Sequence, residues 1–315
     1  MTIVITDGYT CNPGDLSWEG ITQLGDTAIY DRTAPEEIIN RCQYAEIVVT
    51  NKTPISKETI EQLPNLKLIC VTATGYNIVD TAAARERNIP VCHVPAYGTY
   101  SVAQHTFALI LHITNLVALH AESVRQGDWV RAADWSYTKS PLIELAGKTI
   151  GIVGMGNIGE QVGRMAIAFG MGVIYYSRRK KDVSFATYVN LDEIFKHADF
   201  ISLHCPLTSE NKHFVNNNLL SLMKRHAWLI NTARGPLINE QDLADALNSG
   251  RIGGAALDVL STEPPTADNP LLSAKNCIIT PHNAWVTKEA RGRIIKVTVE
   301  NIQAFLNGKP QNVVN

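Results

Sequence analysis

The 315-residue sequence lacks the patterns that mark several classes of protein. None of its six cysteines forms a CxxC pair and no HExxH motif is present, so neither a disulfide framework nor a bound metal is predicted. We interpret the cysteines as the reduced thiols of a cytoplasmic protein. Lysine and arginine (28) nearly balance aspartate and glutamate (30), which gives no indication of a nucleic-acid-binding face.

Long apolar runs are also missing. The N-terminal run has no basic residue before it and ends at Asp7, so we expect a first β-strand there and not a signal peptide. The longest helix-like apolar stretch, 107–119, is interrupted by His112, Thr114 and Asn115. It is too short and too polar to span a bilayer, and no membrane segment is predicted.

Short apolar runs alternate with helical patterns, which predicts βα units around parallel sheets, and the chain length favours two domains. A long helix is expected over 101–119, capped by Ser101 and Gln104, and a last helix over 287–306. The strands are predicted at 3–6, 47–50, 66–71 and 90–94, and then at 149–153, 173–176, 200–204, 228–231, 255–259 and 277–280.

The strongest local signal is a G-x-G-x-x-G motif placed between a predicted strand and a predicted helix. Gly154 allows the tight turn, Gly156 lets the backbone approach a pyrophosphate, and Gly159 lets the helix pack closely on the strand. The helix N-terminus then offers N–H groups to the phosphates. The motif predicts a dinucleotide site that includes Gly154, Met155, Gly156, Asn157, Ile158 and Gly159.

The second strand of this βαβ unit ends without the carboxylate that usually binds the adenosine ribose. The sequence there is Tyr176-Ser177-Arg178-Arg179-Lys180-Lys181. A hydroxyl at Ser177 and cations at Arg178 and Arg179 suit a ribose 2′-phosphate, which favours NADPH. The alternative is a solvated basic turn in a protein that uses NADH.

Three further segments place reactive side chains after predicted strands, where open α/β sheets bind ligands. His282 has a side chain suited to proton transfer near neutral pH, and Glu263 would orient its ring. Arg234 can bind a carboxylate, and Asp258 can hold a nicotinamide carboxamide. Each also has a structural alternative, such as a turn cap for His282 or an ion pair between Arg234 and Glu263.

Several of these segments occur together and in order along nearly the whole chain, and the sequence resembles the D-isomer-specific 2-hydroxyacid dehydrogenase family, in its hydroxypyruvate reductase (glycerate dehydrogenase) branch. The similar stretches are Val71–Asp80, Gly154–Gly159, His204–Thr208, Asn231–Pro236, Ala256–Val259, Glu263–Pro265 and Pro281–Trp285.

The resemblance implies roles for these residues. Arg234, Glu263 and His282 would be catalytic, and Thr74, Gly75, Arg234 and Trp285 would bind the substrate. Met155–Ile158, Cys205, Pro206, Thr232 and Asp258 would line the site of NADP or NAD. Gln104 and Ser177 depart from the family pattern, in which Glu and Asp are common; the first departure is expected to be structural, and the second puts strict use of NAD in doubt.

The resemblance also implies an architecture. A Rossmann-type nucleotide-binding domain, 101–286, would be inserted into a flavodoxin-like substrate domain, 1–100 plus 287–315, in a cytoplasmic homodimer. The chain ends soon after the last predicted helix, so a further regulatory domain is not expected. The domains would close over a small 2-oxo or 2-hydroxy acid.

The expected activity is hydride transfer between NAD(P)H and hydroxypyruvate or glyoxylate, giving D-glycerate or glycolate. Two alternatives remain. One is a D-lactate-type dehydrogenase, which differs only in pocket shape. The other is a non-catalytic NAD(H)-sensing protein on the same scaffold, because fold alone does not decide function.

Overall fold

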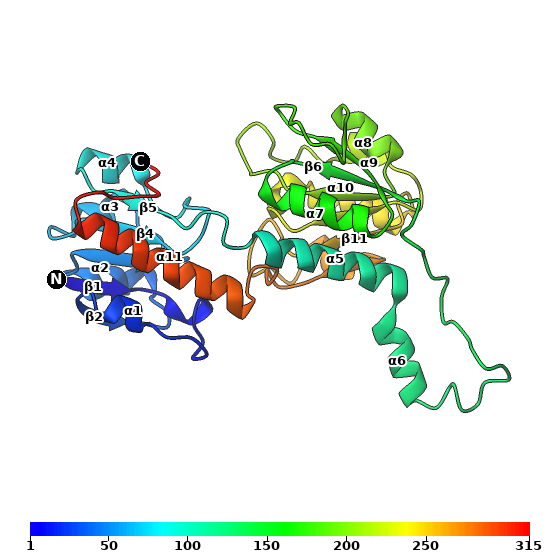
Figure 1. The fold of residues 1–315 in the computed structure, drawn as a ribbon, viewed down its shortest axis with the longest axis horizontal. Coiled ribbons are helices and arrows are strands. Elements are labelled where there is room, and N and C mark those ends of the chain that lie inside the picture. The colour runs from blue at the N-terminus through cyan, green and yellow to red at the C-terminus, as the bar shows by residue number, and fades with distance from the viewer. The chain divides into compact units, whose positions relative to one another are not determined.

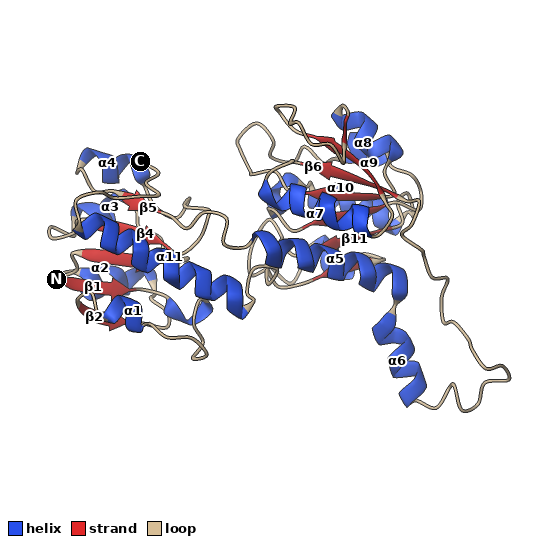
Figure 2. Ribbon diagram, in the orientation of Figure 1, coloured by secondary structure: helices blue, strands red, loops and turns tan.

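The computed structural model describes residues 1–315, which divide into two compact units. Unit 1 contains Met1–Gly98 and Trp285–Asn315, and unit 2 contains Thr99–Ala284. The domain segments expected from the sequence differ from these units by two residues at each boundary. Both units are built on a wholly parallel sheet with helices on its two faces (Figures 1 and 2).

Unit 1 contains a five-stranded sheet in the order β2-β1-β3-β4-β5, the flavodoxin-like order. Its strands are β1 (Thr2–Ile5), β2 (Asp26–Ile29), β3 (Ile47–Thr50), β4 (Leu68–Val71) and β5 (Val91–Cys92). Its helices are α1 (Glu19–Thr22), α2 (Ile38–Cys42), α3 (Lys57–Glu61), α4 (Thr81–Glu86) and α11 (Lys288–Leu306). Alternate residues of β3 face opposite cores: Ile47 and Val49 pack with α1 and α11, and Val48 packs with α2, α3 and α4.

Unit 2 contains a seven-stranded sheet in the order β12-β11-β10-β9-β6-β7-β8. Its strands are β6 (Thr149–Val153), β7 (Gly172–Tyr176), β8 (Thr187–Tyr188), β9 (Phe200–Leu203), β10 (Trp228–Asn231), β11 (Gly254–Leu257) and β12 (Cys277–Ile279). The order reverses between β6 and β9, as in a Rossmann sheet, and ligands bind outside the carboxyl ends of the strands at such a switch point.

Two groups of helices cover the faces of this sheet. α5 (Thr99–Asn115) and α7 (Asn157–Ala168) pack on one core. α8 (Leu191–His197), α9 (Asn217–Leu222) and α10 (Glu240–Asn248) pack on the other. The fold class expected from the sequence is thus confirmed, with two parallel sheets, each covered on both sides.

The long helix predicted over 101–119 was wrong in its bounds. α5 begins at Thr99, so Ser101 and Gln104 lie inside it and form no capping box. The helix ends at Asn115, where Leu116 adopts a left-handed conformation (φ 48°), and α6 (Val117–Arg125) continues at a bend of 54°. No single helix meets the length and hydropathy expected of a membrane span, although α5 and α6 taken together across their bend do.

Candidate active site

The glycine-rich turn joins β6 to α7, and its three glycines have different reasons to be glycine. Gly154 has φ 104°, and a Cβ there would lie 2.5 Å from the Cys205 nitrogen. A Cβ at Gly159 would lie 2.2 Å from the Gly154 carbonyl oxygen. A Cβ at Gly156 would meet nothing within 4 Å. The chain itself therefore requires two of the glycines, and the third leaves open space beside the N-terminus of α7, which fits the approach of a pyrophosphate.

A cavity of about 940 Å³ lies over this turn, at the carboxyl ends of β6, β7 and β9. This volume is at the upper end of the range typical of small-molecule and cofactor sites. The predicted cofactor residues that line it are Gly154, Met155, Gly156, Ser177, Arg178, Cys205 and Pro206. It is also lined by residues that were not predicted as cofactor-binding, namely Tyr176, Lys181, His204, Thr208, Glu210, Asn211 and Phe214 among others.

One wall of the cavity is basic, because Arg178, Arg179 and Lys181 all line it. The turn that carries them is fixed by internal hydrogen bonds. The Ser177 hydroxyl donates to the Arg179 carbonyl at 2.6 Å, and the buried Tyr175 hydroxyl donates to the Lys181 carbonyl at 2.6 Å. The cations are thus held over the cavity by an ordered turn.

Two residues that line the cavity, His204 and Cys205, have side chains that stay neutral. Burial lowers the pKa of His204 to about 3, and its Nε2 lies 2.9 Å from the Ser202 hydroxyl. Burial also raises the pKa of Cys205 to about 11, an effect that the nearby charge of Arg178 partly offsets. A thiol with that pKa is not a nucleophile at neutral pH, so Cys205 acts as an apolar lining residue.

A histidine–carboxylate pair forms the second cluster of the site. His282 Nδ1 lies 2.6 Å from Glu263 Oε2, and Glu263 Oε1 accepts a hydrogen bond from the Leu260 N–H at 3.1 Å. Because a carboxylate only accepts, the Nδ1 proton is donated to Glu263, which leaves Nε2 as the atom that can exchange a proton. His282 has φ 51°, a strained conformation for this residue type and one that is enriched at functional sites.

Asp258 holds the segment that carries His282. Its side chain is 1% exposed. Oδ1 accepts from the Thr280 hydroxyl at 2.6 Å and from the Asn283 N–H at 2.9 Å, while Oδ2 accepts from the Ala284 N–H at 2.9 Å. The His282 N–H donates to the Asp258 carbonyl at 2.8 Å. The segment from Thr280 to Ala284 is therefore tied to one residue at the end of β11.

Arg234 follows β10 with its side chain exposed. The Asn231 side chain donates to the Arg234 carbonyl at 2.8 Å and fixes the turn. A Cβ at Gly235 would lie 1.9 Å from the Leu260 carbonyl carbon, so the Arg234 segment and the Leu260–Glu263 segment are in direct backbone contact. The structure therefore brings together the segments of Arg234, Glu263 and His282 within unit 2.

The remaining predicted residues lie elsewhere. The predicted cofactor residues that do not line the large cavity are Asn157, Ile158, Gly159, Thr232 and Asp258. Thr74, Gly75 and Trp285 belong to unit 1. The Thr74 hydroxyl donates to the Val94 carbonyl at 2.9 Å, and His93 Nδ1 lies 2.9 Å from the Thr74 carbonyl. Trp285 packs edge-to-face on Tyr97, with ring centroids 6.0 Å apart.

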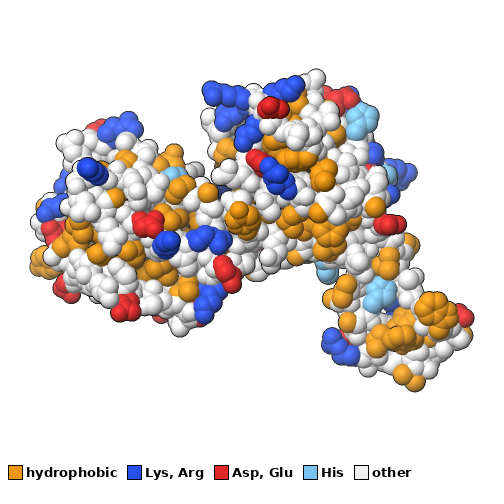
Figure 3. Space-filling model, in the orientation of Figure 1, with side chains coloured by type: hydrophobic (Ala, Val, Ile, Leu, Met, Phe, Trp, Pro, Cys, Tyr) orange, Lys and Arg blue, Asp and Glu red, His pale blue; other side chains and the backbone are white.

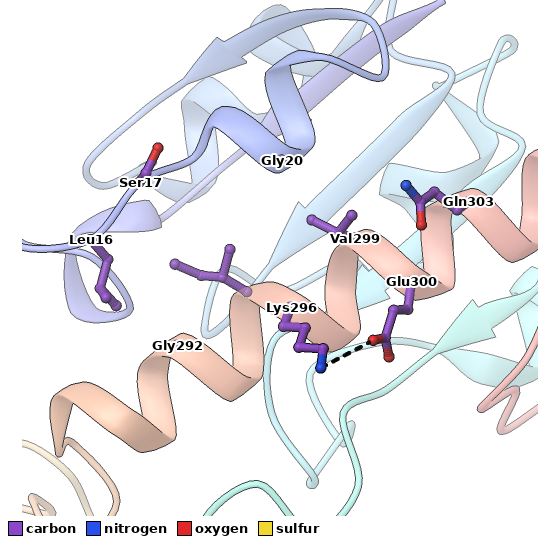
Figure 4. A pocket seen from close by; sticks show the side chains of 9 residues that line it. Leu16, Ser17, Gly20, Gly292, Lys296, Val299, Glu300 and Gln303 are labelled. Atoms are coloured by element: carbon purple, nitrogen blue, oxygen red, sulfur yellow. Dashed lines mark ion pairs between the residues drawn. The ribbon is translucent and has the colours of Figure 1, made fainter.

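Unit 1 also has a smaller hollow of about 420 Å³ between α1 and α11 (Figure 4). Its walls are the apolar side chains of Leu16, Ile295 and Val299, and its charged groups, Lys296 and Glu300, lie 4.0 Å apart as an ion pair. No histidine or cysteine lines the hollow. No group of three or more metal-ligating side chains occurs in either unit.

Comparison with known proteins extends over the whole chain. Residues 107–284 match the family described as D-isomer specific 2-hydroxyacid dehydrogenase, NAD binding domain. The hydroxypyruvate reductase of Blautia hydrogenotrophica is 49% identical over 321 residues, covering 100% of both chains. The glycerate dehydrogenase of Methylorubrum extorquens is 42% identical over 288 residues, covering 90% of each.

The whole chain or nearly all of it also superposes on solved structures. An acyclic imino acid reductase in complex with NADPH and D-Arg superposes with a TM-score of 0.88 at 35% identity, with 100% of both chains covered. The D-lactate dehydrogenase of Aquifex aeolicus, complexed with NAD and lactic acid, superposes with a TM-score of 0.84 at 31% identity, covering 98% of this chain and 96% of the other.

Proposed function

Because the chain belongs to the D-isomer-specific 2-hydroxyacid dehydrogenase family, hydroxypyruvate reductase branch, we propose that it reduces hydroxypyruvate or glyoxylate to D-glycerate or glycolate with NADPH. The family expected from the sequence motifs is confirmed, and with it an NAD(P)-dependent enzyme. The observation that carries the proposal is the His282–Glu263 pair, at 2.6 Å, in the same unit as an open glycine-rich turn.

His282 is the proposed proton donor. A reduced nicotinamide, when bound, would supply a hydride to C2 of the 2-oxo acid, and the carbonyl oxygen would then need a proton to become a hydroxyl. With Nδ1 donating to Glu263, the Nε2 proton of the imidazolium is the one available for transfer. Glu263 stabilises the cationic ring before the transfer and fixes its orientation after it.

Arg234 is proposed to bind the substrate carboxylate, because its exposed guanidinium offers paired donors. In unit 1, the turn at Thr74 and Gly75 is proposed as a carboxylate-binding turn. The Thr74 hydroxyl and carbonyl are already hydrogen-bonded, so an anion at this turn would meet backbone N–H groups. Trp285 is proposed as an apolar wall of the substrate site.

The cofactor preference is proposed from the basic wall of the cavity. Arg178, Arg179 and Lys181 face the space where the adenosine end of the cofactor would lie, and β7 ends without a carboxylate. A ribose 2′-phosphate would gain charge-assisted hydrogen bonds there. By the family resemblance, Asp258 is also proposed to hold the nicotinamide carboxamide.

The test is a turnover assay that follows the loss of reduced-nicotinamide absorbance, with NADPH and NADH each run against hydroxypyruvate, glyoxylate and pyruvate. The proposal predicts the largest kcat/KM for hydroxypyruvate or glyoxylate with NADPH. Preference for pyruvate would indicate the D-lactate-type alternative. Cofactor binding with no turnover in all six pairs would favour the NAD(H)-sensing alternative.

A homodimer in the cytoplasm is the proposed working form. α6 and the loop after it extend away from the sheet of unit 2 (Figure 1), and apolar side chains gather over this arm (Figure 3). Val130 is 91% exposed and Trp135 is 88% exposed. An exposed apolar surface of this kind suits burial against a second copy. Light scattering should give the mass of a dimer for the wild type, and of a monomer for the double variant Val130→Glu, Trp135→Glu.

A further inference from the structure

A second histidine of unit 2 is connected to the His282 segment through a chain of hydrogen bonds. His105 lies in the first half of α5, and its Nε2 is 3.1 Å from the Thr280 hydroxyl. That hydroxyl is 2.6 Å from Asp258 Oδ1, and His105 Nε2 is itself 3.5 Å from the same oxygen. This contact could not be predicted from the sequence, because His105 and Thr280 are 175 positions apart.

The donors and acceptors in this chain have one consistent direction. Asp258 accepts from the backbone N–H of Asn283 and of Ala284, so its carboxylate acts as an acceptor. The single hydroxyl proton of Thr280 therefore points to Asp258 Oδ1, and the oxygen of Thr280 can only accept from its other neighbour. His105 must then carry a proton on Nε2. The resulting order is His105 Nε2–H to Thr280 Oγ1–H to Asp258 Oδ1.

This chain ends on the residue that holds His282. Asp258 makes two hydrogen bonds to backbone N–H groups immediately after His282 and one, through its carbonyl, to the N–H of His282 itself. A buried polar network is rigid when all its members are hydrogen-bonded, so the contacts of Asp258 with Thr280 and His105 help to fix its orientation. The His105 side chain provides the outermost fixed point, because α5 is packed on the core of unit 2.

We propose that His105 is a positioning residue, which acts through Thr280 and Asp258 to fix the segment Thr280–Ala284 and with it the orientation of His282. The structural part of this inference stands on the contacts alone, and its effect on turnover rests on the proposed function. A neighbouring contact, between the hydroxyls of Thr106 and Thr232 at 3.1 Å, joins the same helix to the segment before Arg234.

The test compares His105→Leu with His105→Gln. Leucine removes the donor, whereas the amide nitrogen of glutamine can occupy nearly the position of Nε2. For His105→Leu we expect kcat to fall on the order of 10-fold with KM changed less than about twofold, since misplacement of a catalytic group lowers the rate of the chemical step. His105→Gln should recover most of kcat. His112→Leu, an exposed histidine of the same helix, is the matched control and should match the wild type.

Hydrogen exchange gives a measurement that does not depend on activity. In His105→Leu the peptide that contains residues 280–284 should exchange faster, while the rest of unit 2 and the Tm stay close to the wild type. Thr280→Val should abolish the difference between the leucine and glutamine variants, because the connecting hydroxyl is gone.

Three results would overturn the inference. The first is a wild-type rate of hydrogen exchange at residues 280–284 in His105→Leu. The second is an equal loss of kcat in the leucine and glutamine variants. The third is a lowered Tm in His105→Leu with unchanged kcat. If the wild type fails to oxidise NADPH with any 2-oxo acid, the proposed function fails, while the exchange measurement still supports or refutes the role of His105 in holding the segment.

Discussion

The two units share an architecture and differ in how they use the carboxyl ends of their strands. In unit 1 the turns after β1 and β3 are filled by the chain itself, because the Asp7 carboxylate accepts hydrogen bonds from the N–H groups of Asn51 and Thr53. In unit 2 the turn after β6 keeps open space at Gly156. The comparison shows that a doubly wound sheet does not itself make a cofactor site, and that the turn residues decide where one forms.

Two histidines of unit 2 make the same point about chemistry. His204 is buried without a charged partner, and burial lowers its pKa to about 3, so it stays neutral at physiological pH. His282 is partly exposed and pairs with a carboxylate. Side chains of one type are therefore suited to different roles, a neutral lining group for His204 and the proposed proton donor for His282, because their surroundings differ.

The largest expected effect concerns the proton donor. His282→Ala should lower kcat by about 100-fold or more, the usual contribution of general acid catalysis, with little change in Tm. Steady-state kinetics and thermal unfolding would check this. His197→Ala is a matched control, because His197 forms a 2.9 Å pair with Glu193 on α8, outside the site. Wild-type turnover in His282→Ala would remove this residue from its proposed role.

Substitution of Gly156 should weaken cofactor binding, whereas substitution of Gly159 should lower the stability of the fold. Gly156→Val places a side chain in open space, so the fold should persist while NADPH affinity falls by about 10- to 100-fold, since forced overpacking costs about 1–3 kcal/mol. Gly159→Val drives a side chain into the Gly154 carbonyl and should lower Tm. Fluorescence titration and calorimetry separate the two effects, and equal loss of Tm in both would contradict the assignment of Gly156 to the cofactor.

A smaller effect is expected at the basic wall. Ser177→Asp with Arg178→Gln should lower the ratio of kcat/KM for NADPH to that for NADH by about 10-fold, because a carboxylate repels the 2′-phosphate and accepts from a ribose hydroxyl. Lys180→Gln is the control, since Lys180 is exposed on the same turn but does not line the cavity. An unchanged ratio would show that the turn is merely a solvated charged segment.

The smallest effect concerns the stability of unit 1. Arg291 pairs through two hydrogen bonds with Asp15, at 2.7 Å each, and the hydrogen bond to this arginine lowers the pKa of Asp15 below its usual 3.8. A lowered folded-state pKa stabilises the protein above the unfolded-state value, and the stabilisation is lost as the pH falls through the folded-state pKa. Asp15→Asn should therefore lower Tm by a few degrees at about pH 6, and this difference from the wild type should shrink steadily as the pH falls below the usual pKa of 3.8. A difference in Tm that is independent of pH would contradict this.

The strands buried on both sides could be predicted from the sequence. β3, β6 and β10 have the bounds expected from continuous apolar runs. The edge strands β2 and β8 were missed, because they are short and partly exposed and give no such signal. The break at Leu116 could not be foreseen either, since leucine is a good helix former and the left-handed turn there is not marked by a glycine or proline.

In the site, as in the fold, local features could be predicted from the sequence and long-range contacts could not. The open space at Gly156 followed from the local motif, and the reactive types of His282 and Glu263 were visible in the sequence. The proton position on His282, the strain at its backbone and the contact of His105 with Thr280 depend on segments far apart in the chain. Asp258 was expected only beside the cofactor, and its bonds to Thr280, Asn283 and Ala284 became apparent only in three dimensions.

The most direct test of the account is a single isotope-transfer measurement. Hydroxypyruvate would be turned over with NADPH deuterated at C4 of the nicotinamide, and the product analysed by mass spectrometry and chiral chromatography. Hydride transfer in this family predicts D-glycerate, with deuterium at C2 when the label occupies the transferred face. Two results would contradict the account. One is L-glycerate as the product, and the other is a product without deuterium whichever of the two C4 hydrogens of NADPH is replaced by deuterium.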